Sequence, residues 1–189
     1  QDFDGGGTPY ATSLYGNGPA AEVRSDGPTG SYLRLIYDNV TWNLNRATFD
    51  RVLEGAASRV TADFDFRMYS PTNPDHPADG FSFLLLPTSM YGTSGVGSDG
   101  SYASEEPNLP NTFAIGFDTY PEDSGVNDVS AHWNGVEIRN VRLTNAQLDL
   151  DAGVFHRVQV ELVQVVGGMQ VTVTLTPDMS VQQAWALML

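Results

Sequence analysis

Apolar and polar residues alternate along most of this chain. In the segment 60–69, Val60, Ala62 and Phe64 fall on one face, and Thr61 and Asp63 fall on the other. A period of two residues indicates a β-strand with one face in a core and one in water. The two acids of this segment, Asp63 and Asp65, are therefore expected on a solvated face. The pattern predicts further strands over residues 32–37, 46–49, 113–117, 129–133, 137–143, 155–166 and 169–176.

Turn residues separate these strands. Asn134-Gly135 and Gly167-Gly168 are predicted to close tight hairpins, because Asn and Gly tolerate positive φ. Residues 81–86 carry almost no polar side chain, which predicts a central strand covered on both faces. Residues 1–30 are turn-rich, residues 91–110 form a long Gly/Ser-rich loop, and no helix is expected before the apolar tail at 181–189. The fold class is therefore expected to be all-β.

The charge balance narrows the range of partners. The 189 residues include 23 acids and nine bases, all of them Arg, for a net charge of −14. Nucleic-acid binding needs a basic surface, so no nucleic-acid partner is expected. No apolar run reaches the length of a membrane span. Without Cys there is no thiol or disulfide chemistry, and the acidic surplus suits solubility, a saline setting or divalent cations.

Oxygen-bearing side chains gather between the strands predicted at 113–117 and 129–133. Asp118 ends the first strand, and Glu122, Asp123, Asn127 and Asp128 follow it. Calcium binds six to eight oxygen ligands of these types. A solvated acidic loop is the alternative, because charged residues are mostly exposed. The position of Asp118 at the end of an apolar strand favours the metal.

Two short motifs carry a resemblance to a known family. Phe-Asp-Thr-Tyr at 117–120, an acidic loop and then Trp-Asn-Gly at 133–135 resemble the metal-loop region of L-type (legume-lectin-like) lectins. Ala-Asp-Gly-Phe-Ser-Phe at 78–83 resembles a strand opening of the same family, at a fitting distance. The N-terminal part is similar to lectin-like domains of bacterial secreted proteins. The resemblance implies a two-sheet antiparallel jelly-roll sandwich of the concanavalin A-like type over residues 1–176, followed by an apolar tail at 177–189.

The resemblance also implies a calcium site. Asp118 matches the family's calcium aspartate, and Tyr120 matches an aromatic residue that ligates through its carbonyl. Glu122 stands where the family usually has Asn, and Asp123 is the alternative there. The last ligand is Asn127 or Asp128.

The position of His132 depends on the alignment chosen. Counted from Asp118, His132 falls at the spacing of the family's metal histidine, whereas alignment on the hairpin gives that place to Asp128. We prefer the second, because it respects strand alternation, and then His132 is an ordinary strand residue. Gly116 replaces the Glu of the family's second, transition-metal site, so no second metal is expected.

For carbohydrate, the resemblance points to Asp79, whose family equivalent accepts hydrogen bonds from sugar hydroxyls. A turn cap at a strand start is the alternative role. Backbone groups of Gly80, Gly97 and Gly100 and a stacking ring such as Tyr102 complete the expected carbohydrate site. Related glucanases carry catalytic Glu residues on both sides of the position of Asp118. Here the strand runs Gly116-Phe117-Asp118-Thr119-Tyr120, so both Glu residues are missing and no enzyme activity is expected.

Two functions from different classes remain. The first is a secreted, calcium-stabilised carbohydrate-binding module with a glycan as partner. The second is an extracellular surface or filament subunit that keeps the fold, has lost sugar binding, and self-associates through a sheet edge or the apolar tail.

Overall fold

The chain folds as an all-β protein with several antiparallel sheets. A computed structural model describes residues 3–5, 7, 9–27, 30–51, 54–71, 79–95, 105–120, 126–177 and 185–188. For residues 126 and 185–188 only the backbone is described. In these ranges the only helix is α1 (Thr88–Tyr91), and no helix is long and apolar enough to cross a membrane. Contacts divide the chain into two compact units, Gln1–Glu54 with Leu85–Ser101 and Gly55–Leu84 with Tyr102–Leu189.

The first unit contains two antiparallel strand pairs. β1 (Tyr10–Gly16) pairs with β4 (Asn43–Phe49), and β2 (Glu22–Gly27) pairs with β3 (Gly30–Arg34). The strand predicted at 46–49 is confirmed and begins earlier. The strand predicted at 32–37 ends at Arg34, so the prediction is wrong for the residues that follow. There, side chains of β4 form hydrogen bonds with the backbone groups that a neighbouring strand would otherwise bind. Tyr37 N donates to Asn43 Oδ1 (3.0 Å), and Asn45 Nδ2 donates to Leu35 O (2.7 Å).

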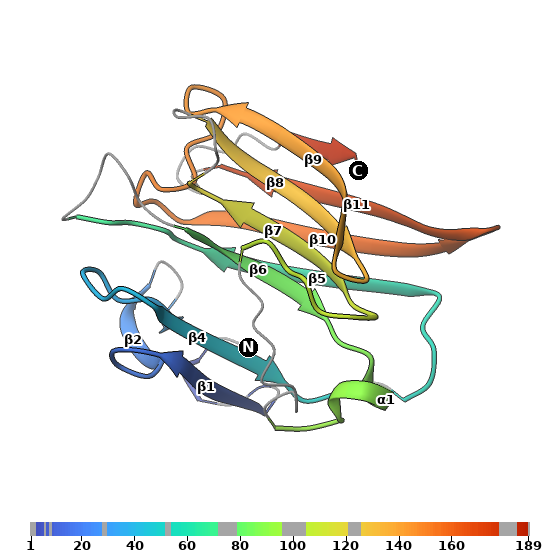
Figure 1. Ribbon diagram of the computed structural model, residues 1–189, viewed down its shortest axis with the longest axis horizontal. Coiled ribbons are helices and arrows are strands. Elements are labelled where there is room, and N and C mark those ends of the chain that lie inside the picture. The colour runs from blue at the N-terminus through green and yellow to red at the C-terminus, as the bar shows by residue number, and fades with distance from the viewer. Residues whose placement is uncertain are drawn as a thin grey trace. The chain divides into compact units, whose positions relative to one another are not determined.

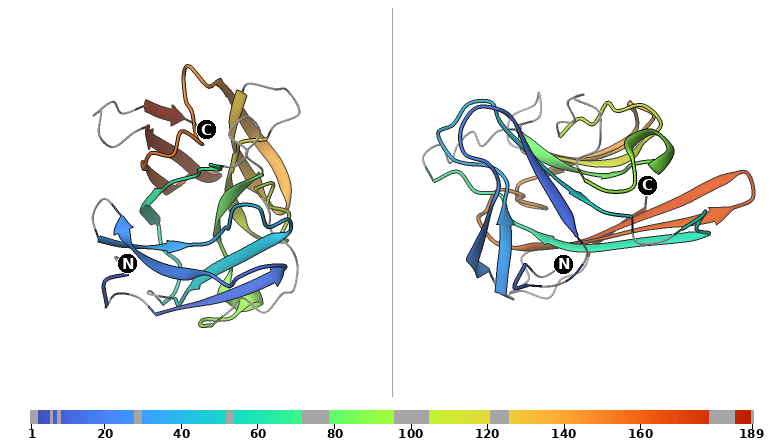
Figure 2. Two further views of the ribbon diagram at one scale, coloured as in Figure 1. Left: turned by 90° about the vertical axis from the view of Figure 1, so that its left-hand side faces the viewer. Right: turned by 90° about the horizontal axis from the view of Figure 1, so that it is seen from below.

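The second unit contains two four-stranded sheets (Figure 1). The back sheet has the order β12 (Trp185–Met188), β11 (Gly168–Thr176), β10 (His156–Val165) and β5 (Arg59–Phe66). The front sheet has the order β6 (Gly80–Leu85), β7 (Phe113–Asp118), β8 (Val126–Trp133) and β9 (Val136–Thr144). Figure 2 shows the two sheets as separate layers when this unit is seen from below.

Aromatic side chains fill the space between these layers. Phe66 of β5 contacts Phe81 of β6 and Phe117 of β7, with ring centroids 4.7 and 5.2 Å apart. Phe81 and Phe117 stack at 4.8 Å, and Phe117 is fully buried. These residues come from the apolar positions of the alternating pattern. Burying large aromatic rings contributes much of the stability of a core of this kind.

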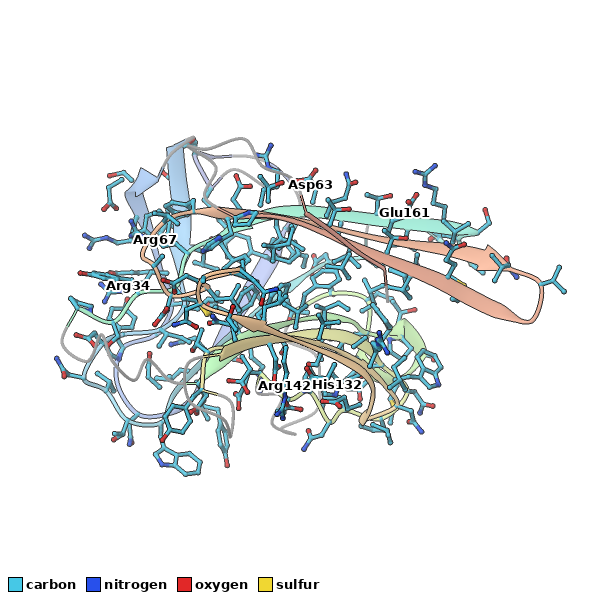
Figure 3. The ribbon with its side chains drawn as sticks, turned by 90° about the horizontal axis from the view of Figure 1, so that it is seen from above. Arg34, Asp63, Arg67, His132, Arg142 and Glu161 are labelled. Atoms are coloured by element: carbon cyan, nitrogen blue, oxygen red, sulfur yellow. The ribbon has the colours of Figure 1, made fainter. Side chains whose placement is uncertain are left out.

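The polar positions of the pattern face outward. In Figure 3 Asp63 and Glu161 lie on the outer side of the back sheet, and His132 and Arg142 lie on the outer side of the front sheet. Arg157 donates to both carboxylate oxygens of Asp65, at 2.8 and 3.1 Å. Asp63 and Asp65 therefore belong to a solvated, ion-paired face, as the alternation predicts.

Two hairpin turns test the turn predictions. Asn134 and Gly135 have φ of 53° and 73°, so the Asn-Gly hairpin is confirmed. The second turn is displaced by one residue from its prediction. Val165 pairs with Gly168, so the turn residues are Val166 and Gly167, and only Gly167 has positive φ (91°).

Two apolar segments differ from their predictions. β6 is the end strand of the front-sheet order, and each of its residues is partly exposed, so it is not the doubly covered central strand. Residues 185–188 form strand β12 along β11, where a helix was predicted. The physical reason is that the edge of β11 offers unpaired N–H and C=O groups to the tail. Short apolar runs do not distinguish strand from helix by periodicity.

Candidate cation site on the front sheet

The front sheet carries a row of polar side chains on its outer face. The register places Asp118 opposite Asp128 and Gly116 opposite Ser130. On the other side of β8, Asp128 lies opposite Arg142 and His132 lies opposite Glu137. Alternate residues of a strand share a face, so β8 presents Asp128, Ser130 and His132 together on this side. Figure 3 shows His132 and Arg142 here.

A segment before β7, residues 105–112, lies against this outer face, and we call it the strap. A Cβ at Gly116 would overlap the carbonyl oxygen of Glu105 and stand 2.6 Å from Ser130 Oγ. A Cβ at Gly135 would stand 2.6 Å from the carbonyl oxygen of Asn108. Both glycines therefore let the backbone of the strap approach the sheet closely.

Hydrogen bonds fix the far end of the strap to the β8–β9 hairpin. Asn111 N donates to Asn134 Oδ1 (2.7 Å), and Asn134 N donates to Thr112 O (2.9 Å). Within the strap, Thr112 Oγ1 donates to Leu109 O (2.8 Å). Hydrogen bonds thus fix the strap at its far end, and the close approach of Glu105 to Gly116 places its near end against the sheet.

That residue, Glu106, joins two groups of potential metal ligands. One ligand atom each from Glu106, Asp118 and Asp128 lie within 4.8 Å of one another. The same holds for Glu106, His132 and Glu137. Because Glu106 belongs to both groups, the two form one continuous cluster.

Burial and like charge shape the electrostatics of the cluster. Asp118 and Asp128 are only 8% and 3% exposed. Burial, with the charges of Asp128, Glu137 and Asp118 adding to it, raises the pKa of Glu106 to about 7. Burial likewise raises the pKa of Asp128, against the opposing effects of the hydrogen bond from Asn140 and of the Arg142 charge. Because these carboxylates lie close together and are partly buried, a proton or a cation bound among them is favourable.

One carboxylate oxygen in the cluster is left without a partner. Asp128 Oδ2 accepts from Asn140 Nδ2 (3.2 Å), but Asp128 Oδ1 is buried and has no hydrogen-bond donor among the described residues. Asn140 Nδ2 also donates to Glu137 Oε2 (3.1 Å), while Asn140 Oδ1 is buried without a partner in the same described part. Buried unpaired acceptors cost roughly 1–3 kcal/mol each, and a bound cation satisfies them.

His132 borders the cluster as a buried imidazole. It is 4% exposed, with Nε2 2.7 Å from Ser130 Oγ and 3.6 Å from Glu106 Oε2. Burial lowers the pKa of His132, although Glu137 and Asp128 oppose this. The neutral imidazole that results is the form that binds metals.

The structure brings together some of the expected calcium ligands. Asp118 and Asp128 meet, and Tyr120 N donates to Asp118 Oδ1 (2.6 Å). Asn127 lies outside the cluster, because its amide donates to Leu148 O (2.7 Å) and to an asparagine of the next turn. Asn127 therefore supports the turn after β9. Glu122 and Asp123 lie outside the described residues.

The expected carbohydrate residues are placed in part. Asp79 is exposed, and its carbonyl oxygen accepts from Thr119 N (2.9 Å) and Thr119 Oγ1 (3.1 Å). Gly80 has φ of 153°, and a Cβ there would overlap the carbonyl oxygen of Phe117. Asp79 is therefore tied to the residue that follows Asp118. Gly97, Gly100 and Tyr102 lie outside the described residues.

Sequence reasoning missed Glu106. It stands in a Glu-Glu-Pro-Asn-Leu-Pro run at the end of a long loop, and no spacing rule places such a run on a sheet. Gly116 was the available signal, since a glycine inside a strand often marks the close approach of another backbone.

The chain was compared with models of known protein families and with curated protein sequences. No family model matches it, and no curated protein matches it.

Proposed function

We propose that this protein is a secreted, calcium-stabilised carbohydrate-binding module with a concanavalin A-like jelly-roll fold. The observation that carries the proposal is the buried pair Asp118 and Asp128 beside Glu106, together with Asp128 Oδ1, which has no hydrogen-bond donor among the described residues. Its all-β architecture, with several antiparallel sheets, is consistent with such a fold.

Calcium suits the chemistry of this pair. Three carboxylates lie within reach of a single ion, and hard cations prefer oxygen ligands of this kind. Arg142 is the positive side chain opposite Asp128, and one guanidinium does not balance the four carboxylates of the cluster. Asp118, Asp128 and Glu106 supply carboxylate oxygens in this proposal. The remaining ligands come from the carbonyl of Tyr120 and from Glu122 or Asp123.

The carbohydrate is proposed to bind beside the cation, at Asp79. The Asp79 carboxylate is exposed, whereas its backbone is bonded to Thr119, directly after the calcium aspartate. An exposed, positioned carboxylate accepts hydrogen bonds from sugar hydroxyls, and the net charge of −14 disfavours anionic glycans. A neutral glycan is therefore the proposed ligand.

A structural subunit without sugar binding is the second candidate. The end of the β10–β11 hairpin exposes apolar side chains, with Val166 fully exposed and Val165 and Met169 exposed by 43% and 46%. Exposed apolar groups of this kind favour contacts between protein copies.

A glycan array separates the two candidates. The wild-type protein is expected to bind neutral glycans in calcium and to lose binding in EDTA. Asp79→Asn should weaken binding at least tenfold, whereas Asp63→Asn, an exposed acid on the back sheet, should bind like wild type. An array with no hit, together with concentration-dependent polymers, would reject the carbohydrate proposal and favour the structural subunit.

A further inference from the structure

The first unit presents a tryptophan to solvent on a strained backbone. Trp42, the residue before β4, has a φ of 62° and is 69% exposed. An exposed apolar side chain is ordinary by itself, but a positive φ is a genuine outlier for a bulky residue. Neither the strain nor the solvated indole stabilises the fold. Backbone strain of this kind is typical of functional positions, so the indole itself is the feature to explain.

Contacts with residues 16–18 hold the backbone of Trp42 in this conformation. Asn17 N donates to Trp42 O (2.8 Å), and Asn17 Nδ2 donates to Thr41 O (3.2 Å). Asn43 Nδ2 donates in turn to Asn17 O (2.7 Å). A Cβ at Gly16 would overlap Trp42 O, so only glycine permits this approach. The backbone that carries the indole is therefore already ordered before any ligand binds, which lowers the entropic cost of binding.

A second exposed ring lies across the strand pair. Tyr15 of β1 is 53% exposed and pairs with Leu44 of β4. Trp42 precedes Leu44 by two residues, so Tyr15 and Trp42 occupy diagonal positions at the end of the pair. Residues in diagonal positions are within reach of each other when their side chains are aromatic.

The two segments that carry these rings contain no charged residue. Residues 8–21 and 39–45 lack Asp, Glu, Lys and Arg, although 17% of the chain is charged and its net charge is −14. Their polar side chains are amides and hydroxyls. A flat aromatic ring packs against the C–H face of a sugar ring, and amides and hydroxyls bind its hydroxyl groups. A nucleic acid or an anionic membrane would need basic groups that these segments lack.

We propose that Trp42 and Tyr15 form a stacking platform for a neutral polysaccharide. The platform belongs to the first unit, whereas the carbohydrate site proposed at Asp79 belongs to the second. The ligand class rests on the proposed function, and the platform adds a second contact for that class. Its two segments contain no carboxylate side chain, so binding here does not need calcium.

The test is electrophoresis in native gels that contain dextran, hydroxyethyl cellulose or galactomannan, with EDTA present. Stacking on two rings is weak binding, which a gel rich in polysaccharide detects and a washed glycan array does not. At least one of the three polysaccharides should retard wild type. Trp42→Gly should abolish that retardation yet melt at or above the temperature of wild type, because glycine adopts positive φ without strain. Trp42→Phe should keep part of the retardation.

Trp133→Ala is the matched control, because it removes an indole that is 56% exposed in the second unit, and it should be retarded like wild type. The platform is overturned if no gel retards wild type in EDTA, or if Trp42→Gly is retarded as wild type is. A large fall in the melting temperature of Trp42→Gly would assign the indole to stability and also overturn it. If Trp42→Gly instead abolishes self-association in sedimentation and leaves the gels unchanged, Trp42 is a contact between protein copies.

The use of EDTA separates this proposal from the proposed function. Retardation in EDTA that depends on Trp42, with no calcium-dependent hit on the array, would keep the platform and reject the calcium-dependent site. Array binding in calcium without retardation in EDTA would reject the platform alone.

Discussion

Replacing Gly116 with alanine tests how the strap is held on the front sheet. The new Cβ would overlap the Glu105 carbonyl oxygen, and it would stand 2.6 Å from Ser130 Oγ. That second separation is about 1 Å short of an ordinary contact of roughly 3.5 Å. The overlap with Glu105 involves backbone, so the strap itself has to move.

The expected loss follows from overpacking at this position. Inserting a methyl group into a filled site destabilises by about 1–3 kcal/mol. A loss of about 2 kcal/mol lowers the melting temperature of a chain of this size by roughly 4–8 °C. The movement also displaces Glu106, so the proposed stabilisation by calcium should shrink in the same variant.

The assay is urea unfolding followed by circular dichroism, with Gly168→Ala as the matched control. Gly168 is also a strand glycine, but a Cβ there has no neighbour within 4 Å. Its replacement should be neutral or should stabilise by about 0.4–1 kcal/mol through the unfolded state. Equal unfolding free energies for Gly116→Ala and Gly168→Ala would refute the close approach of the strap.

Three further changes test other parts of the second unit. Burial and the Asp149 carboxyl raise the pKa of Asp151 to about 7. The folded state therefore holds a proton that the unfolded state releases near pH 4, so its stabilising effect is full below pH 4 and disappears as pH rises through 7. The free energy of unfolding of wild type relative to Asp151→Asn should fall between pH 4 and 8, and parallel profiles in urea would contradict this. Asn127→Ala should destabilise by about 1–3 kcal/mol, because Leu148 O loses its donor, yet leave the calcium response unchanged in thermal melts. Arg157→Ala should change the free energy of unfolding by no more than about 1 kcal/mol, because its ion pair is partly exposed, and a larger loss in urea would contradict that view.

Most strands of the second unit could be predicted from the sequence, because each buries one face. The alternation at 60–69 and 155–176 places Phe64, Phe66, Val158 and Val160 inward, as the structure has them. The predictions fail for apolar segments in which no alternation of polar and apolar residues distinguishes a strand from a helix. An apolar tail reads equally as helix or strand, and the edge of β11 decides between them.

The candidate site was predictable only along β7 and β8. Asp118 and Asp128 meet because β7 and β8 pair in antiparallel register with these two residues directly opposite each other. Glu106 reaches the same face through a long-range contact of the strap, which local patterns do not encode. Asn127 was a possible ligand by its sequence position, but its side chain lies on the opposite face from that of Asp128. Neighbouring residues of a strand point to opposite faces.

Thermal melts of wild type and Asp128→Asn, in excess calcium and in EDTA, test whether Asp118 and Asp128 hold a cation as proposed. A ligand at a hundredfold excess over its Kd stabilises the folded state by about 2.7 kcal/mol, or roughly 5–11 °C for this chain. Wild type should show that shift. Asp128→Asn should show none. In EDTA it should be at least as stable as wild type, because it removes the charge of a buried carboxylate whose Oδ1 has no partner among the described residues. Identical wild-type melting temperatures in calcium and in EDTA would contradict the cation site.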